Sequence, residues 1–326
     1  MSFKCIFFEK KRIILTVILA YSFIITFAQQ IPQYPVSYRI FSPFIFNPAM
    51  AGSKDFSSID LITGWQGKSN SQILSANSRL TKKGQGYFMT PNTRKYSGFG
   101  VGGYLFNEKK SPSRNLGIGV AGSYQLPLDE QSVSFLSFGI AVKGVYNIMD
   151  SVFYSDPLLN TPGKNIFYPN MDAGLYYYGP KLFAGASAVN LLGNPEDPDS
   201  TGVYRLPVAR HYYFIAGYKF TLSESLDIVL EPSLIINKNR YNNEKASDFL
   251  EPMLKLYVQG FCMGTYLYDY DNISFFFQFK YPRFYVGTFF ELPRKTPFYK
   301  KDINLELTFG LNFTVIRSRN IKYYHW

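Results

Sequence analysis

The sequence predicts an all-β protein, a transmembrane antiparallel β-barrel of about 14 strands with an irregular N-terminal arm or plug. Aromatic residues make up 18% of the chain although the mean hydropathy is only −0.09. That combination is typical of strands that meet lipid on one face and carry aromatic girdles at both interfaces. Apolar and polar residues alternate with period two along most of the chain, which indicates half-buried strands. Long and short connections alternate between these strands, as in outer-membrane barrels.

Residues 1–28 have the composition of a secretory signal peptide. A basic stretch that ends at Arg12 precedes the apolar residues 13–27, and Ala28 offers a small residue for cleavage. A retained membrane anchor is the alternative, but the apolar stretch is short for a full span of about 20 residues. Cleavage removes four basic residues and one acid, so the net charge of +11 falls to +8. A basic surface favours anionic lipid headgroups or an acidic partner, and no basic helix or binding module indicates nucleic acid.

Residues 29–55 are expected to form an irregular arm that docks on the barrel. Pro43 and Pro48 exclude one regular helix or a central strand across residues 38–53, yet the apolar residues there are too dense for a free tail. Asn47 and Pro48 predict a fixed turn, and the small residues that follow it allow close backbone approach. We therefore expect this arm to plug or rim one mouth of the barrel.

Residues 56–313 are expected to form the barrel, and residues 314–326 a basic tail. The clearest alternation runs along residues 303–313, and residues 273–281 repeat it with Phe276 as the exception. The fourteen candidate strands lie near 56–66, 71–81, 96–106, 115–127, 133–148, 170–179, 180–190, 208–221, 225–236, 248–259, 260–270, 272–281, 282–292 and 302–313. A soluble β-sandwich is the alternative, but it needs a continuous buried core, whereas the faces opposite the apolar ones are polar or glycine-rich.

The connections predict how the barrel is oriented in the membrane. Long links are expected at 107–114, 149–169, 191–207, 237–247 and 293–301, and tight turns follow most of the other strands. This asymmetry predicts long loops outside the cell and both termini in the periplasm. The link 82–95 is long on the periplasmic side and breaks the pattern. The polar faces predict a lumen lined by charged residues, for which the candidates are Lys143, Asp227, Glu231, Lys280 and Glu306.

The sequence contains no pattern for catalysis, for a cofactor or for a metal. The only histidines are His211, expected in the aromatic belt, and His325, in the tail. A transition-metal site needs a cluster of His or Cys residues that the sequence lacks. The glycine-rich run 98–103 lies inside a predicted strand with no helix after it, which favours barrel packing over nucleotide binding. The acidic segment 194–199 is expected to be a solvated loop, since it lacks the ligand spacing of a calcium-binding loop.

Residues 47–53 (NPAMAGS) resemble the opening signature of the PorP/SprF family of outer-membrane proteins. Further similarities follow in the family's order, at residues 119–128, 136–139, 155–157, 171–177, 185–191 and 231–234. The sequence departs from the family pattern at 63–66, where an arginine is missing, at 259–261, and in the tail. The resemblance covers essentially the whole chain after the signal peptide.

The resemblance implies a non-enzymatic component of the type IX secretion and gliding machinery. Its expected partners are outer-membrane lipid, periplasmic ring proteins, peptidoglycan-linked proteins and a secreted adhesin. We expect partners to bind the arm at Arg39, Phe44, Asn47, Pro48, Ala49, Gly52 and Ser53. Two other functions remain open: a FadL-like channel or transporter for small apolar solutes, and a lipid hydrolase that uses His211 as its base.

Overall fold

The computed structural model describes residues 36–54, 56–67, 69–80, 98–110, 113–128, 134–149, 165–192, 210–239, 249–268, 272–281, 283–293 and 303–313. Several predictions lie outside the described residues: the signal peptide, arm residues 29–35, the link 82–95, the motif 155–157, the segment 194–199, the tail and His325. The described helices are short, namely α2 (Tyr38–Phe41), η1 (Pro43–Ile45) and η2 (Pro48–Met50). None of them is long and apolar enough to cross a membrane.

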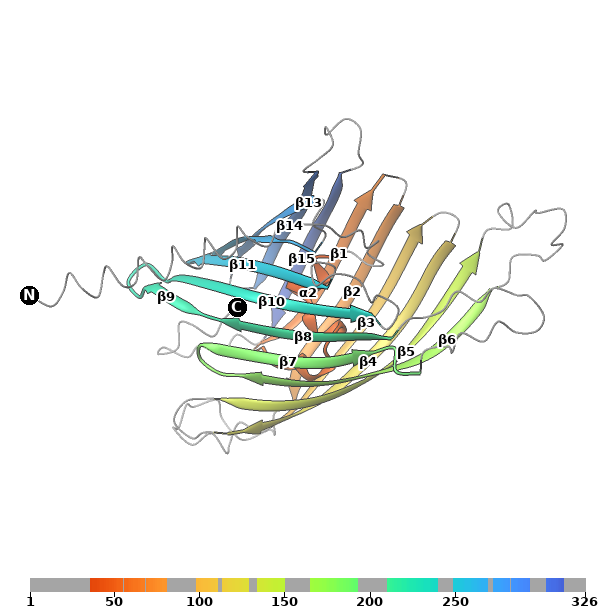
Figure 1. Cartoon of the computed structure of the whole chain (residues 1–326), viewed down its shortest axis with the longest axis horizontal. Coiled ribbons are helices and arrows are strands. Elements are labelled where there is room, and N and C mark those ends of the chain that lie inside the picture. Colours follow the sequence, from red (N-terminus) through yellow and green to blue (C-terminus); the bar gives the residue numbers. More distant parts are fainter. Residues whose placement is uncertain are drawn as a thin grey trace, which may run out of the picture.

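The strands form one antiparallel sheet that closes on itself (Figure 1). They are β1 (Ser57–Gln66), β2 (Ser69–Leu80), β3 (Gly98–Lys110), β4 (Ser113–Pro127), β5 (Phe135–Met149), β6 (Ile166–Tyr178), β7 (Leu182–Val189), β8 (His211–Tyr218), β9 (Phe220–Ser223), β10 (Ile228–Asn239), β11 (Leu250–Val258), β12 (Phe261–Tyr266), β13 (Asn272–Lys280), β14 (Phe284–Pro293) and β15 (Asn304–Phe313). β8 and β9 both pair with β10 and together make one wall strand, interrupted at Lys219. The result is a closed barrel of 14 strands, as the sequence predicts.

The first and last strands close the barrel. β1 pairs with β15 along its full length, from Ser57 opposite Phe313 to Gln66 opposite Asn304. We call the end at which β1 begins and β15 ends the N-terminal mouth. This pairing leaves neither β1 nor β15 as a free edge of the sheet, which suits a lipid environment because backbone groups there have no water to bind.

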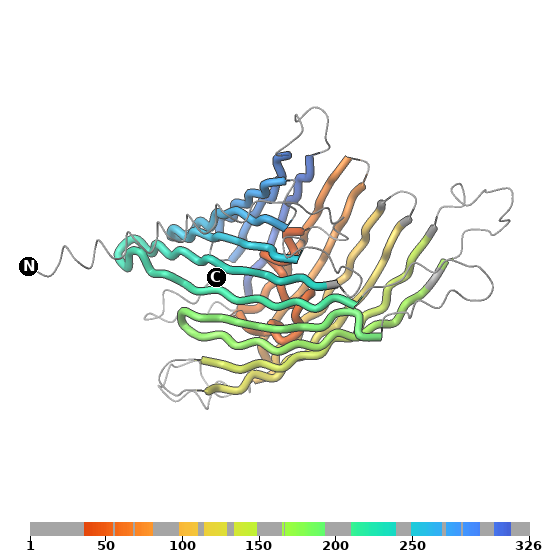
Figure 2. The backbone as a smooth tube through the Cα atoms, viewed as in Figure 1, coloured from red at the N-terminus to blue at the C-terminus, as the bar shows by residue number. Residues whose placement is uncertain are grey.

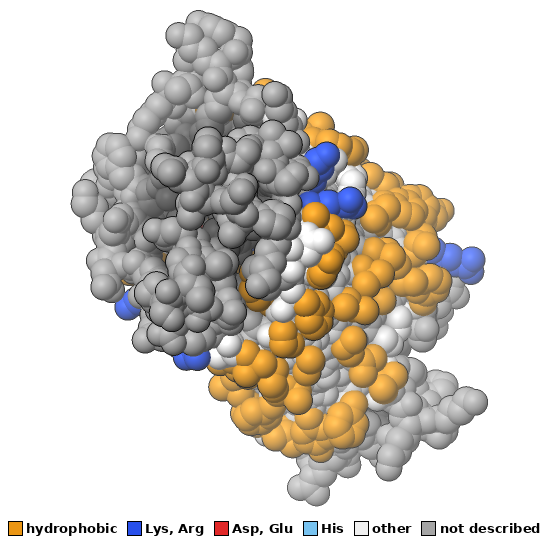
Figure 3. Space-filling view, turned by 90° about the vertical axis from the view of Figure 1, so that its right-hand side faces the viewer, with side chains coloured by type: hydrophobic (Ala, Val, Ile, Leu, Met, Phe, Trp, Pro, Cys, Tyr) orange, Lys and Arg blue, Asp and Glu red, His pale blue; other side chains and the backbone are white. Residues whose placement is uncertain are grey.

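Side chains alternate between lipid and lumen, as the period of two predicts. Along β15 the apolar positions are 38–47% exposed and the polar side chains between them 1–5%: Leu305, Leu307, Phe309, Leu311 and Phe313 against Asn304, Glu306, Thr308 and Asn312. Figure 3 shows hydrophobic side chains spread over much of the described wall on the side that faces the viewer. Phe276, the exception in the predicted pattern, faces inward, where it is 2% exposed and packs over Gly264 of the neighbouring strand.

One predicted connection is wrong. Residues 107–114 were expected to form a long loop, but β3 continues to Lys110 and β4 begins at Ser113. The polar residues of this stretch satisfy one another across the two strands, where Asn115 donates to Glu108 at 3.3 Å. The polar residues here therefore belong to the ends of two paired strands and not to a loop.

Several other connections follow the predicted asymmetry. At the N-terminal mouth the described turns 179–181, 224–227 and 259–260 are short. At the opposite end the strands on either side of 150–165, 190–210 and 240–249 are joined by longer segments. The long connection 81–97 at the N-terminal mouth and the short connections 67–68 and 267–271 at the opposite end break the predicted pattern, and nothing in the structure explains them.

Candidate functional site

Residues 36–54, which we call the plug, lie inside the barrel (Figure 2). The two prolines set the plug's shape, because Pro43 begins η1 and Pro48 begins η2. Proline suits the first position of a helix, where its missing N–H is not needed. The Asn47 side chain caps η2 by accepting a hydrogen bond from the Ala49 N–H at 3.1 Å. The irregular arm predicted from the sequence is thus a chain of single turns.

Hydrogen bonds from wall side chains hold the plug backbone. Three serines donate to plug carbonyls: Ser187 of β7 to Phe46 (2.6 Å), Ser137 of β5 to Ala49 (2.7 Å) and Ser123 of β4 to Ala51 (2.6 Å). Arg79 of β2 donates to the Gly52 carbonyl at 2.8 Å. These bonds satisfy backbone groups that have no partner in a regular element, so an irregular segment can be buried. They also fix the position of the plug along several neighbouring strands.

Inward-facing glycines bring the plug backbone into contact with the wall. A Cβ at Gly139 of β5 would overlap the backbone of Pro48 and Ala49, and a Cβ at Gly100 of β3 would overlap the Ala51 carbonyl. Gly52 of the plug has φ +65°, which other residues rarely adopt, and it lies against Gly100. The glycine-rich run 98–103 therefore serves barrel packing, as its position in a strand indicated.

An ion pair anchors the start of the plug. Arg39 binds Glu251 of β11, whose carboxylate also accepts hydrogen bonds from Tyr266 and, at 3.1 Å, from Asn237. Burial by itself would lower the pKa of the Arg39 guanidinium, but the neighbouring Glu251 raises it well above its ordinary value. Arg39 therefore stays charged, and its side chain is only 12% exposed. His211, which the hydrolase hypothesis needs as a base, lies 3.2 Å from the Asn237 amide oxygen in this polar layer.

Two wall carboxylates receive hydrogen bonds from the plug. Glu306 of β15 accepts the N–H groups of Val36 and Ser37 at 2.8 and 2.9 Å. Asp60 of β1 accepts the Ser42 hydroxyl at 3.3 Å and the Tyr285 hydroxyl at 2.7 Å. Buried carboxylates are costly without such donors, so plug and wall depend on each other.

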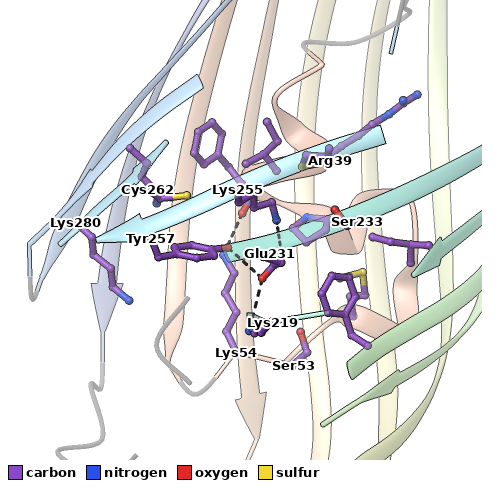
Figure 4. A pocket seen from close by; sticks show the side chains of 18 of the residues that line it. Arg39, Ser53, Lys54, Lys219, Glu231, Ser233, Lys255, Tyr257, Cys262 and Lys280 are labelled. Atoms are coloured by element: carbon purple, nitrogen blue, oxygen red, sulfur yellow. Dashed lines mark hydrogen bonds and ion pairs between the residues drawn. The ribbon is translucent and has the colours of Figure 1, made fainter. Parts of the chain in front are cut away.

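The predicted lumen residues fall into different surroundings. Lys143 is paired with Asp172 of β6 at 2.8 Å, with both side chains buried. Glu231 lies between Lys255 (3.0 Å) and Lys219 (3.8 Å) (Figure 4). Asp227 lies in the turn before β10, with φ 49°, and so is not part of the lumen wall. Lys219 and Lys255 were not singled out from the sequence, although the alternation in their predicted strands points both inward.

The predicted partner-binding residues come together in the plug. Five of them are buried against the wall: Phe44, Asn47, Pro48, Ala49 and Gly52. Arg39 and Ser53 are partly buried. Partner binding by these residues stays a prediction, and the geometry assigns the buried ones to positioning the plug. Among the described residues there is no group of three His, Cys, Asp or Glu side chains that could hold a metal ion.

Comparison with solved structures finds other membrane barrels. CdiB from Acinetobacter baumannii has a TM-score of 0.39 and 8% identity over 79% of this chain and 60% of its own. The transport unit of the autotransporter AIDA-I from Escherichia coli has a TM-score of 0.36 and 10% identity over 88% of this chain and 100% of its own. The chain thus spans about 60% of the length of CdiB. No curated protein sequence matches.

Comparison with protein families gives an assignment. Residues 26–315 match the family described as "Type IX secretion system membrane protein PorP/SprF". The match runs from the end of the predicted signal peptide, through the plug and the entire barrel, to just past β15. The chain is an outer-membrane β-barrel that belongs to the PorP/SprF family of type IX secretion system membrane proteins.

Proposed function

We propose that this barrel is a scaffold of the type IX secretion and gliding machinery, with its N-terminal mouth in the periplasm. It holds periplasmic ring proteins and peptidoglycan-linked proteins there and supports the secretion or surface attachment of an adhesin. The plug, around Arg39 and residues 47–53, forms the rigid base of the partner-binding surface.

The observation that carries this proposal is the fit of the plug inside the wall. Plug and wall share hydrogen bonds, an ion pair and backbone contact at glycines on several strands. A segment bonded in this way occupies the lumen as part of the core and does not act as a loose gate. The family match supplies the secretion context.

Partner recovery from membranes tests the scaffold. We expect a tagged mature protein, isolated from outer membranes in mild detergent, to bring ring proteins or a large adhesin with it, identified by mass spectrometry. A variant that lacks residues 38–53 is expected to lose these partners, because the plug that supports the partner-binding surface is then absent. Heat-modifiable migration in gels checks that the variant still forms a barrel. A solitary wild-type barrel, or full recovery with the folded variant, contradicts the proposal.

Conductance in planar bilayers separates the scaffold from a channel for small solutes. The intact protein is expected to conduct weakly, because the plug occupies the lumen. Removal of residues 38–53 is expected to raise single-channel conductance severalfold, because a barrel of this strand number encloses a wide lumen once it is emptied. High conductance of the intact protein, unchanged by the deletion, favours the channel or transporter.

A further inference from the structure

A cavity of about 140 Å³ remains between the plug and wall strands from β6 to β15. It lies at the N-terminal mouth, because its lining includes Lys280, the last residue of β13, and Asn312, next to the end of β15. Lys54 and Phe56, which lead from the plug into β1, line it as well. The cavity therefore lies close to this mouth of the barrel.

The charges in this cavity are unbalanced. Lys54, Lys219 and Lys255 line it together with Glu231, which is the single carboxylate among the described lining residues. Arg39 and Lys280 line it as well, but Arg39 is paired with Glu251 and Lys280 has interactions of its own, so the excess does not depend on them. Glu231 is shared between Lys255 at 3.0 Å and Lys219 at 3.8 Å, and it also accepts the Tyr257 hydroxyl at 3.4 Å (Figure 4). The side chains of Lys219 and Lys255 are only 21% and 16% exposed, so water solvates and screens their charges incompletely. The cavity thus holds an excess of positive charge that favours an anion.

The side-chain amide of Asn312 is a second feature of this cavity that indicates a ligand. The Asn312 side chain lines it and is 4% exposed, yet neither its amide nitrogen nor its amide oxygen has a hydrogen-bond partner among the described residues. A buried amide without partners is costly, and native structures rarely keep one without a reason. A ligand carboxylate would accept from the amide nitrogen while the lysines neutralise it.

Besides the polar side chains of Ser53, Ser233 and Gln278, the cavity is lined by apolar side chains, which indicate what carries the anion. Phe41 and Met50 of the plug line it together with Ile215 and Met253 of the wall. Apolar side chains and lysines that line one cavity suit a carboxylate on a short hydrocarbon stem, next to apolar side chains. We propose that the cavity binds a carboxylate of an acidic, partly apolar peptide segment in a partner protein. This inference rests on the proposed function and adds the chemistry of the contact.

Peptide binding to the full mature chain in detergent micelles tests the inference. The probe is a fluorescein-labelled peptide of alternating glutamate and leucine. The control peptide carries the same label and has glutamine in place of glutamate. The acidic peptide is expected to bind at least about tenfold more tightly than the control peptide, because only its carboxylates can form charge-assisted hydrogen bonds with the lysines. Its affinity is expected to fall as salt rises, because salt screens the lysines.

Three variants locate the binding site. Lys219→Gln is expected to weaken acidic-peptide binding about tenfold, and it leaves Glu231 bonded to Lys255 and Tyr257. Lys181→Gln is the matched control, because Lys181 is exposed in the β6–β7 turn at the same mouth and outside the cavity. Asn312→Leu separates binding from folding. Removing an unsatisfied amide should raise the unfolding temperature while it weakens peptide binding.

Defined outcomes overturn the inference. Equal affinity for the two peptides would show that the cavity does not bind the acidic peptide through its carboxylates. An equal loss of acidic-peptide affinity in Lys219→Gln and Lys181→Gln would show that the peptide does not bind in the cavity. Stronger competition by inorganic phosphate than by acetate removes the carboxylate assignment. If ring proteins or an adhesin are still recovered from membranes with Lys219→Gln while the peptide does not bind, the scaffold stands without this contact.

Discussion

Replacing Gly139 with alanine is expected to drive the plug away from the wall. The added Cβ would overlap the backbone of Pro48 and Ala49, and neither the plug backbone nor strand β5 can move cheaply. Overpacking of a core typically costs about 1–3 kcal/mol, and contact with backbone on both sides places this change near the upper value. The unfolding temperature in detergent should fall, and chymotrypsin should cleave at Phe44 or Phe46 in the folded barrel.

Gly122→Ala provides the control for this experiment. Gly122 lies on β4 and faces the outer side, and a Cβ there meets nothing within 4 Å. The substitution carries the same propensity change in a strand without touching the plug, so stability and protease resistance should match those of the wild type. Equal behaviour of the two alanine variants would show that the plug does not depend on close contact with β5.

Replacing Arg39 with methionine is expected to destabilise the protein by about 3–5 kcal/mol, the usual cost of removing one partner of a buried ion pair. Glu251 would remain as a buried carboxylate, with its side chain 5% exposed, and would keep only the neutral donors Tyr266 and Asn237. Guanidinium unfolding in detergent, followed by tryptophan fluorescence, measures the loss of free energy.

A double variant checks the cause of that loss. Arg39→Met combined with Glu251→Gln removes both charges, so it should recover much of the stability, because the penalty comes from the unpaired carboxylate. If the double variant loses as much as the sum of the two single variants, the ion pair is not the anchor. Unchanged stability of Arg39→Met alone would lead to the same conclusion.

Much of the barrel could be predicted from local patterns. The predicted strands 56–66, 272–281 and 302–313 differ by no more than two residues at either end from β1, β13 and β15. The error at 107–114 arose because charged residues were taken as loop residues, whereas Glu108 and Asn115 pair across a hairpin. The predicted strand 208–221 is divided at Lys219 into β8 and β9, and no residue pattern there indicates the interruption.

The candidate site was predicted only in part. The density of apolar residues and the prolines at 43 and 48 indicated a docked irregular segment, and that segment forms the plug. Its seven proposed contact residues were expected to meet a partner, yet five of them lie against the wall. Exposure of an irregular segment cannot be derived from its own composition, because the surface that covers it comes from strands far along the chain.

The sequence by itself determined the fold class and which side chains face lipid, because period-two alternation is a local property of each strand. Only the tertiary structure decided which lumen groups meet the plug. Glu306 accepts a hydrogen bond from the Val36 N–H, which is 270 positions away in the sequence. Gly139 lies against the backbone of Ala49 because the folded barrel brings these two distant residues together. The group of lysines at the N-terminal mouth arises in the same way. Lys54, Lys219, Lys255 and Lys280 belong to four separate segments, and only the register of a closed barrel brings them to one cavity.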